Sequence, residues 1–146
     1  MIYRKGDITS NTTGVLINGV NCQGRMGSGV AKAYLDKWPI VKTIYLNDHG
    51  SKGLGDCRLI HVGPGLYVAN CYTQEFFGYD GKKYASYNAI ENSVFQAASA
   101  ADALGVAVKT PYVGCGLGGM SWDEEVQPLL SEIEKAWGEQ IEVWAL

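Results

Sequence analysis

Glycine is concentrated in a short stretch, NCQGRMGSGVA, at residues 21–31. Gly24, Gly27 and Gly29 lie between an apolar run at residues 15–20 and a segment with helical spacing. Glycine loses much chain entropy on folding and adds no side chain to a core, so its use here suggests that a ligand approaches the backbone closely. The amide groups of a loop between a strand and a helix can hold an anion, with help from the helix dipole.

A second glycine-rich stretch, VGCGLGGMSWDE, covers residues 113–124, again between a predicted strand and a predicted helix. Gly114, Gly116 and Gly119 match the spacing G-x-G-x-x-G. A dinucleotide-binding fold also needs a second nucleotide-binding half and an acidic residue about 20 positions further on, which here falls late in a helix, near Glu134. A P-loop is excluded because Met120 stands where that motif has its lysine.

Two glycine loops at the carboxyl ends of parallel strands would share one edge of the sheet, where ligands bind in open α/β folds. A pyrophosphate held between them fits both loops. The alternative is that the glycines only form tight turns. Asp7, in KGDIT directly after the first predicted strand, adds an acceptor for the exocyclic amine of a base, or else it is a turn or cap residue.

The elements that must position these loops follow from hydrophobic periodicity, which alternates between strand and helix patterns and predicts an α/β fold. A GPG turn at residues 63–65 predicts a hairpin, so the sheet is mixed. Pro128 predicts a kink or a later start in the last helix, which has capping-box spacing at Ser121 and Glu124. Strands are predicted at residues 2–5, 14–20, 57–62, 67–72, 106–110 and 141–146, and helices after the first glycine loop, from residue 39 to near 50, at 86–104 and after 121.

Composition limits the class of protein. The 146 residues are 47% hydrophobic and 18% charged, which predicts one globular domain over residues 1–146. A net charge of −3 with scattered basic residues argues against nucleic acid as a partner, and no apolar run is long enough for a membrane span. The N-terminus lacks a secretory signal pattern, so we expect a cytoplasmic protein, and we expect a monomer. Neither the four cysteines nor the two histidines have zinc-site spacing, so we expect free thiols, no metal and no cofactor.

Taken together, KGDIT, NCQGRMGSGVA, VGCGLGGMSW and the ending IEVWAL resemble the macrodomain superfamily, whose members bind ADP-ribose. The resemblance covers essentially the whole chain. It is strongest to the compact branch that contains ADP-ribose-1″-phosphate phosphatases, the terminal ADP-ribose protein glycohydrolase and DNA ADP-ribosyl glycohydrolase antitoxins. It implies a three-layer α/β/α fold with a mixed, mostly parallel central sheet.

The resemblance also implies roles for the motif residues. Asp7 would meet the adenine, with the backbone of Ile8 beside it. The first glycine loop would wrap the distal ribose and a phosphate, and the second would hold the diphosphate through backbone N–H groups. The ligand-binding residues so implied are Asp7, Ile8, Asn21, Gly24, Met26, Gly27, Ser28, Gly29, Val30, Gln74, Val113, Gly114, Cys115, Gly116, Leu117, Gly118, Gly119 and Met120.

Departures from the family pattern bear on the chemistry. Glycohydrolases of this branch carry a nucleophilic lysine where this chain has Gln74, and an aspartate where it has Gly118. Glutamine cannot form a Schiff base, so cleavage by the lysine route is not expected. Some phosphatase-type members have a histidine near the end of the second strand, where this chain has Asn18.

The segment TQEFFGYDGKKYASY, residues 73–87, resembles the phosphatase-type members instead. Asp80 is the candidate general acid, general base or nucleophile, although D-G is also a turn signal. Asn21 would position the ribose or terminal phosphate, and Lys82 or Lys83 would screen phosphate charge. We therefore expect a metal-independent ADP-ribose-1″-phosphate phosphatase. The alternatives are a non-catalytic ADP-ribose reader and an ADP-ribosyl hydrolase without the lysine nucleophile. Phe76, Phe77 and Tyr79 would cover the ligand or pack the loop.

Overall fold

The computed structural model of the chain describes residues 1–26, 29–75, 85–115 and 118–146. Its centre is a six-stranded sheet in the order β1-β6-β5-β2-β4-β3. Every neighbouring pair is parallel except β3 with β4, which form the predicted hairpin. The strands are β1 (Ile2–Lys5), β2 (Gly14–Asn21), β3 (Cys57–Gly63), β4 (Leu66–Gln74), β5 (Val108–Thr110) and β6 (Glu142–Ala145).

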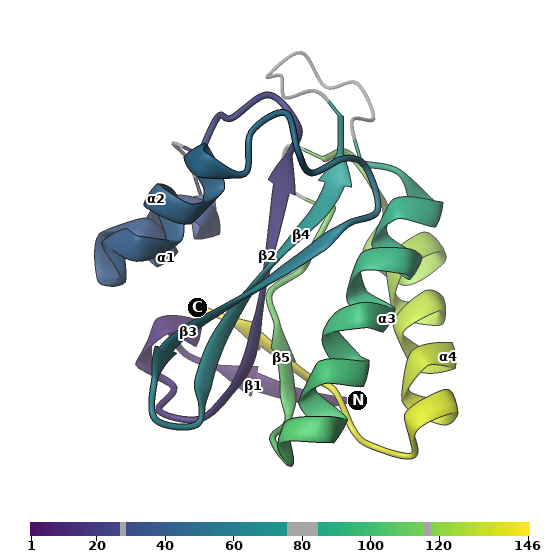
Figure 1. Ribbon diagram of the computed structural model, residues 1–146. Helices are drawn as coiled ribbons and strands as arrows, with labels where there is room; N and C mark the ends of the chain where they lie inside the picture. The colour runs from purple at the N-terminus through teal and green to yellow at the C-terminus, as the bar shows by residue number, and fades with distance from the viewer. Residues whose placement is uncertain (27–28, 76–84, 116–117) are drawn as a thin grey trace.

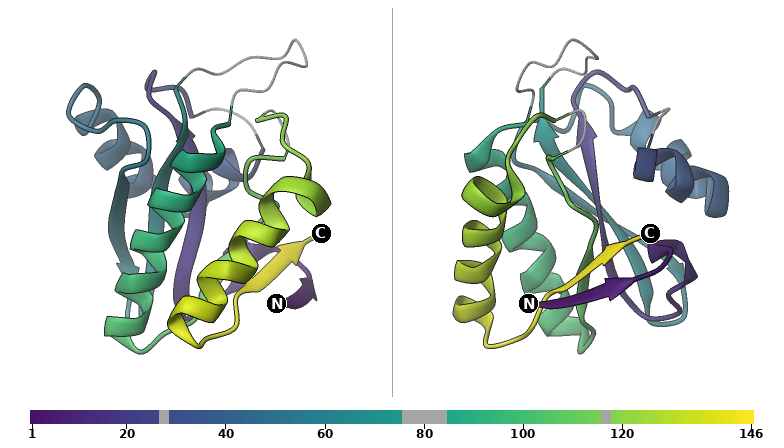
Figure 2. Two further views of the ribbon diagram at one scale, coloured as in Figure 1. Left: turned by 90° about the vertical axis from the view of Figure 1, so that its right-hand side faces the viewer. Right: turned by 180° about the vertical axis from the view of Figure 1, so that it is seen from behind.

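Helices cover both faces of the sheet, as the resemblance implied (Figure 1). The helices α1 (Gly29–Lys37) and α2 (Pro39–Asn47) lie on one face. The helices α3 (Tyr87–Leu104) and α4 (Gln127–Trp137) lie side by side on the other (Figure 2). A short 3-10 turn, η1 (Ile8–Ser10), follows β1. The fold is thus the expected three-layer α/β/α sandwich with a mixed, mostly parallel sheet.

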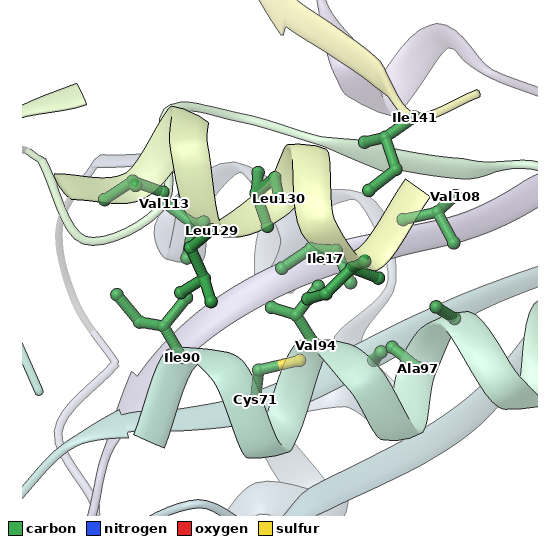
Figure 3. Packing of buried hydrophobic residues seen from close by; sticks show 14 of the residues in the cluster. Ile17, Cys71, Ile90, Val94, Ala97, Val108, Val113, Leu129, Leu130 and Ile141 are labelled. Atoms are coloured by element: carbon green, nitrogen blue, oxygen red, sulfur yellow. The ribbon is translucent and has the colours of Figure 1, made fainter. Parts of the chain in front are cut away.

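Two hydrophobic clusters hold these layers together, one on each face of the sheet. Residues of β2 alternate between them, since Val15 and Ile17 point toward α3 and α4 while Leu16 and Val20 point toward α1 and α2. Figure 3 shows Ile90, Val94 and Ala97 of α3 facing Leu129 and Leu130 of α4 in the first of these clusters. Both faces of the parallel strands are therefore buried, which explains the nearly continuous apolar runs in the sequence.

Helix boundaries follow local signals. Ser86 caps α3 by accepting from the Ala89 amide at 3.4 Å, and Gly105 ends that helix with φ +71°. Pro128 gives the later start that it predicts. It has no N–H to donate to residue 124, and a π-helical turn, η2 (Trp122–Val126), precedes α4.

Some expectations about the helix faces and strand lengths are wrong. Helical spacing places Val30, Tyr87 and Leu104 on apolar helix faces, but all three are exposed and lie in the first or last turn of their helices. The predicted strand at 106–110 begins only at Val108, since the preceding residues close the end of α3 through the bond from the Val106 amide to the Ala101 carbonyl. Within the described residues, no helix is both long and apolar enough to cross a bilayer.

Candidate functional site

The two glycine loops leave the same edge of the sheet, as predicted. Strand β2 is parallel to both β5 and β4, so the first glycine loop (residues 21–30) and the second glycine loop (residues 113–120) follow carboxyl ends that point the same way (Figure 1). Gln74, at the end of β4, lies opposite Asn21 in the sheet register. The amide of Cys22 donates to the Gln74 carbonyl at 3.1 Å. The structure thus brings Asn21, Gln74 and both loops to one edge.

Asn21 shapes the first loop through its side chain. Its Oδ1 accepts from the amides of Gln23 at 3.0 Å and Arg25 at 3.3 Å, and its Nδ2 donates to the Arg25 carbonyl at 2.8 Å. The hydroxyl of Tyr45, which comes from α2, donates to the Asn21 backbone oxygen at 2.5 Å. Burial raises the pKa of Tyr45 to about 12, so this hydroxyl keeps its proton. Asn21 therefore acts first as the support of the loop, and a role toward substrate stays a prediction.

Gly24 lies where a side chain would collide with the chain that follows α2. Its φ is +75°, and an added Cβ would lie 2.6 Å from Nδ1 of His49. Met26 is buried beneath the loop, and Gly29 and Val30 open α1 with exposed positions. The first amides of α1 have no partner within the helix and lie beside the loop. The predicted ligand residues Gly27 and Ser28 lie outside the described residues.

The second loop is closed by its own carbonyl groups. The Gly114 carbonyl accepts from the Met120 amide, and the Gly118 carbonyl accepts from the Ala85 amide, both at 2.9 Å. In the described part of the chain, no backbone carbonyl accepts from the amides of Gly114 and Gly119. Backbone amides that no described carbonyl accepts from are possible donors to an anion, and the predicted anion site stays a prediction. Gly116 and Leu117, also predicted to bind, lie outside the described residues.

Side chains of the second loop contribute to the core. Val113 and Met120 are buried in the cluster beneath α3 and α4, so their side chains are not free to contact a ligand. Cys115 packs against the same cluster, and its burial raises the pKa of the thiol to about 11. A neutral thiol is a poor nucleophile, so Cys115 is not a nucleophile candidate.

The start of the helix after the second loop is capped by the protein's own side chains, which reduces the expected dipole contribution. Ser121 caps the turn η2 by accepting from the Glu124 amide at 3.3 Å, and its own amide donates to Glu125 Oε1 at 3.0 Å. Asp123 and Glu124 add further negative charge to the first turn. Carboxylates of the protein itself thus already interact with the start of the helix, which weakens its contribution to an anion site.

Asp7 is a cap residue in this structure. Its Oδ1 accepts from both the amide and the hydroxyl of Thr9, at 2.9 and 2.8 Å. These two hydrogen bonds, with a smaller contribution from the charge of Lys37, lower the pKa of Asp7. The exposed carboxylate is held ionised and oriented, which is compatible with the predicted acceptance from adenine. Ile8, beside it, is buried in the second cluster.

The departures from the family pattern have physical consequences. A Cβ at Gly118 would lie 2.5 Å from the Gly114 carbonyl oxygen and 3.0 Å from Ala85 Cβ, so an aspartate does not fit this backbone. Asn18 lies buried in the sheet, where its Nδ2 donates to Asn70 Oδ1 at 3.0 Å. Asn18 therefore does not replace the histidine of phosphatase-type members as a surface group.

The candidate catalytic residue Asp80 lies outside the described residues, together with Lys82, Lys83, Phe76, Phe77 and Tyr79. Across the described ranges, no group of three His, Cys, Asp or Glu side chains forms a metal site. A cavity of about 540 Å³ lies elsewhere, between residues 54–56 and α3. Asp56 and Glu91 line it, and their charges disfavour an anionic ligand there.

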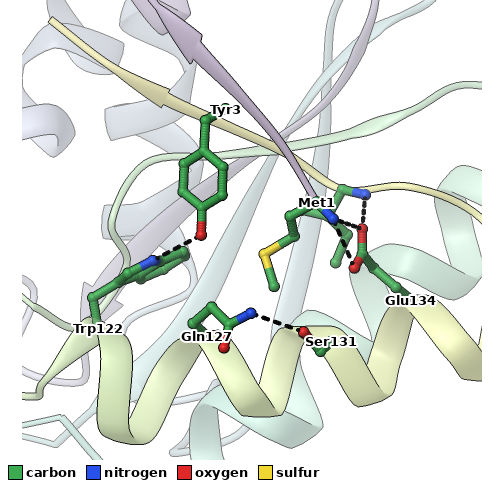
Figure 4. Close-up of polar contacts among 7 residues, drawn as sticks. Met1, Tyr3, Trp122, Gln127, Ser131 and Glu134 are labelled. Carbon is green, nitrogen blue, oxygen red and sulfur yellow. Dashed lines mark hydrogen bonds and ion pairs between the residues drawn. The ribbon is translucent and has the colours of Figure 1, made fainter.

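Sequence reasoning missed two supports of the site, Tyr45 and an aromatic brace. The helical spacing of residues 39–50 indicates only that Tyr45 faces inward. A buried phenol usually has a hydrogen-bond partner, and that rule is the signal that could have pointed to its role. The brace holds the base of the second loop, where the ring of Tyr112 packs edge-on against that of Trp122 with centroids 4.7 Å apart. Trp122 Nε1 in turn donates to the Tyr3 hydroxyl at 3.2 Å (Figure 4). Met1 closes the same side through its amino group, 3.2 Å from Glu134.

Comparison with known proteins agrees with the fold. No family model matches the chain. A DNA ADP-ribosyl glycohydrolase from Mycobacterium tuberculosis is 27% identical over 139 residues, which are 91% of this chain and 38% of that protein. The chain thus spans less than half the length of that curated relative.

Solved structures match over the full length. A Bacteroides thetaiotaomicron protein superimposes with a TM-score of 0.89 at 26% identity, covering 100% of this chain and 99% of the other. A Streptomyces coelicolor macrodomain protein superimposes with a TM-score of 0.84 at 27% identity, covering 99% of this chain and 98% of the other. A Thermosipho africanus DarTG in complex with ADP-ribose shares the fold, with a TM-score of 0.78 at 19% identity. The match covers 98% of this chain and 41% of the other. With its layers, its sheet order and its two glycine loops, the chain belongs to the macrodomain superfamily.

Proposed function

We propose that this protein binds ADP-ribose between its two glycine loops and releases phosphate from ADP-ribose-1″-phosphate. The observation that carries the proposal is the delivery of both loops to one sheet edge by parallel β2 and β5. Within the described residues no backbone carbonyl accepts from the amides of Gly114 and Gly119, so these amides would add donors for a diphosphate at that edge. The complex of the Thermosipho africanus neighbour with ADP-ribose supports this choice of ligand.

The ligand would extend along the edge in a defined order. The ionised carboxylate of Asp7 would accept from the adenine amine, with Ile8 beside the ring. The second loop would hold the diphosphate. Asn21 and Gln74 lie next to each other at the ends of β2 and β4, where they would meet the distal ribose. Asp80 would act on the 1″-phosphate attached to that ribose.

The proposed reaction cleaves a phosphorus–oxygen bond and leaves the glycosidic bond intact. Gln74 cannot form a Schiff base, and the backbone at Gly118 has no room for a carboxylate side chain. Water attacks the phosphorus, the bond to the 1″ oxygen breaks, and Asp80 supplies the proton for the leaving alkoxide. The products are ADP-ribose and inorganic phosphate. Lys82 or Lys83 would offset charge on the phosphate oxygens.

A second candidate is hydrolysis of an ADP-ribosyl linkage to nucleic acid without the lysine. The DNA ADP-ribosyl glycohydrolase relative supports it. The missing lysine and aspartate count against it. A third, a reader that binds ADP-ribose without turnover, is the result expected if Asp80 is only a turn residue.

The test has two measurements on purified protein, calorimetry with ADP-ribose and phosphate release from ADP-ribose-1″-phosphate in the presence of a chelator. The wild type, Asp80→Ala and Glu132→Gln proteins are compared. Glu132 is an exposed residue of α4 that pairs with Lys135, so it serves as the charge-matched control. Release that is lost only in Asp80→Ala supports the phosphatase. Binding without release in the wild type leaves the reader, and absence of binding overturns both.

A further inference from the structure

Two cysteines lie opposite each other in the hairpin formed by β3 and β4. Their side chains are on the face of the sheet that α3 and α4 cover. Cys57 is the first residue of β3, and it pairs in register with Cys71 of β4. Both thiols are free. Neither cysteine has a part in the proposed ligand site, so the inference does not depend on that function.

The hydrogen-bond pattern of the hairpin places these two residues at close range. In an antiparallel pair, hydrogen-bonded and non-hydrogen-bonded positions alternate. The amide of Tyr72 donates to the Asp56 carbonyl at 2.9 Å, so the neighbouring pair, Cys57 with Cys71, is non-hydrogen-bonded. Such pairs bring the Cα atoms to about 4.5 Å, and their side chains lie closer than in the other kind of pair. Disulfides span Cα separations of roughly 4.4–6.8 Å, so no strand movement is needed.

The two sulfurs also share one face of the sheet. Cys71 is fully buried in the cluster beneath α3 and α4, as Figure 3 shows for its side chain near Val94, and Cys57 packs against the same cluster from the edge strand. Cys57 is only partly buried, so it is the member of the pair that a small oxidant can reach. The geometry therefore provides one accessible thiol and one resolving thiol directly opposite it.

The local chemistry favours ionisation of the accessible member. The thiol of Cys71 donates a hydrogen bond that lowers the pKa of Cys57, and nearby Lys52 lowers it further, against burial and the charge of Asp56. The pKa of Cys71 is raised by the same interaction and by burial. A thiolate is the reactive form of cysteine, so Cys57 reacts first.

We propose that Cys57 and Cys71 form a dithiol redox site that hydrogen peroxide converts into an intramolecular disulfide. The Cys57 thiolate attacks one peroxide oxygen, which gives the sulfenic acid and, after protonation of the released hydroxide, water. The Cys71 sulfur then attacks the sulfenic sulfur, the S–S bond forms, and a second water leaves with the Cys71 proton. Two thiols lose two electrons and two protons, and one peroxide becomes two waters. The bond fastens edge strand β3 to β4.

The test is peroxide treatment of the folded protein at low concentration, followed by intact mass, thiol titration and peptide mapping. The expected product is a monomer lighter by two hydrogen atoms, with two of the four thiols remaining and a cross-link between the peptides of Cys57 and Cys71. Dithiothreitol should restore the original mass. Cys57→Ser should slow thiol loss by about tenfold, because burial raises the pKa of each remaining thiol.

Cys115→Ser serves as the matched control and should form the same bond at the wild-type rate. Because Cys71 is fully buried, both Cys71→Ser and Cys71→Ala are made, and mass spectrometry of either variant should show sulfenic or sulfinic acid at Cys57 in place of the cross-link. If the wild type keeps all four thiols, or a bond forms that includes Cys22 or Cys115, or the product is a linked dimer, the proposal is wrong.

Discussion

The hydroxyl of Tyr45 lies 2.5 Å from the backbone oxygen of Asn21 and 2.9 Å from its Oδ1, so a buried phenol of α2 supports the start of the first glycine loop. Asn21 in turn holds the backbone of Gln23 and Arg25. The shape of the first glycine loop therefore depends in part on helix α2.

Tyr45→Phe tests this support. The variant keeps the ring but leaves the Asn21 oxygen without its buried donor, which costs about 1–3 kcal/mol of unfolding free energy. We expect ADP-ribose affinity to fall by roughly tenfold, since each 1.4 kcal/mol of lost loop order is a factor of ten. Chemical denaturation and calorimetry measure the two effects.

Tyr34→Phe is the matched control, because the Tyr34 hydroxyl donates to the mid-strand carbonyl of Ile17 at 2.9 Å, away from the loop. It should lose similar stability and keep its affinity. Equal affinity losses in the two variants would show that the Tyr45 contact has no particular role in the loop.

Gly118→Ala tests the closure of the second loop. The new Cβ would lie 2.5 Å from the Gly114 carbonyl oxygen, so the loop must shift and both stability and ADP-ribose affinity should fall. We expect a loss of stability of about 1–3 kcal/mol, typical of overpacking. Gly53→Ala, where an added Cβ meets nothing within 4 Å, is the control and should be close to neutral. Thermal melts and calorimetry on both proteins measure the two effects. A Gly118→Ala protein with wild-type stability and affinity would contradict the closed loop.

The double variant Gln74→Lys with Gly118→Asp tests whether this backbone can accept the lysine and aspartate that glycohydrolases carry at these two positions. It restores both family residues, yet the loop has no room for the aspartate at this backbone. We expect no cleavage of ADP-ribosyl linkages and a lower melting temperature than in Gln74→Lys alone. Efficient cleavage by the double variant would show that the loop rearranges easily.

Ser121→Ala tests whether the proposed ligand depends on the amides of the second loop alone or also on the start of η2. Loss of this cap should lower stability by about 1 kcal/mol. ADP-ribose affinity should stay within about twofold, because Glu125 and its neighbours already satisfy the start of η2. A large drop in affinity, measured by calorimetry at fixed ionic strength, would place the helix N-terminus in the site.

Asp7 predicts a dependence on pH. Hydrogen bonds from Thr9 lower its pKa below the ordinary value of 3.8, so its ionised form stabilises the fold. That contribution is complete above the unfolded pKa and is lost as the pH falls through the lower, folded pKa. ADP-ribose affinity should therefore be flat from neutral pH down to about 5, where an aspartate is still ionised. Asp7→Asn should bind more weakly by about tenfold at every pH in that range, since one charged acceptor is worth roughly 1.5–3 kcal/mol. A titration of affinity against pH checks both statements.

Much of the fold follows from the sequence by itself. The alternation of apolar periods, the GPG turn, the Ser86 and Gly105 signals around α3 and the effect of Pro128 all depend on local chemistry, and they determined the elements to within a few residues. The two glycine loops likewise indicated an anion site, because their signal lies in residue type and in position between strand and helix.

Tertiary structure decided what those loops contact. Only the parallel pairing of β2 with β5 and β4 brings Asn21, Gln74 and Gly118 to one edge. The tie from Ala85 to Gly118 joins residues far apart in the chain, and no local pattern predicts it. Whether a helix end is free for a ligand or filled by its own carboxylates, as at Ser121, also depends on side-chain placement. Local propensity specifies backbone shape over a few residues, whereas a binding site is assembled from long-range contacts whose register the packing of the whole sheet determines.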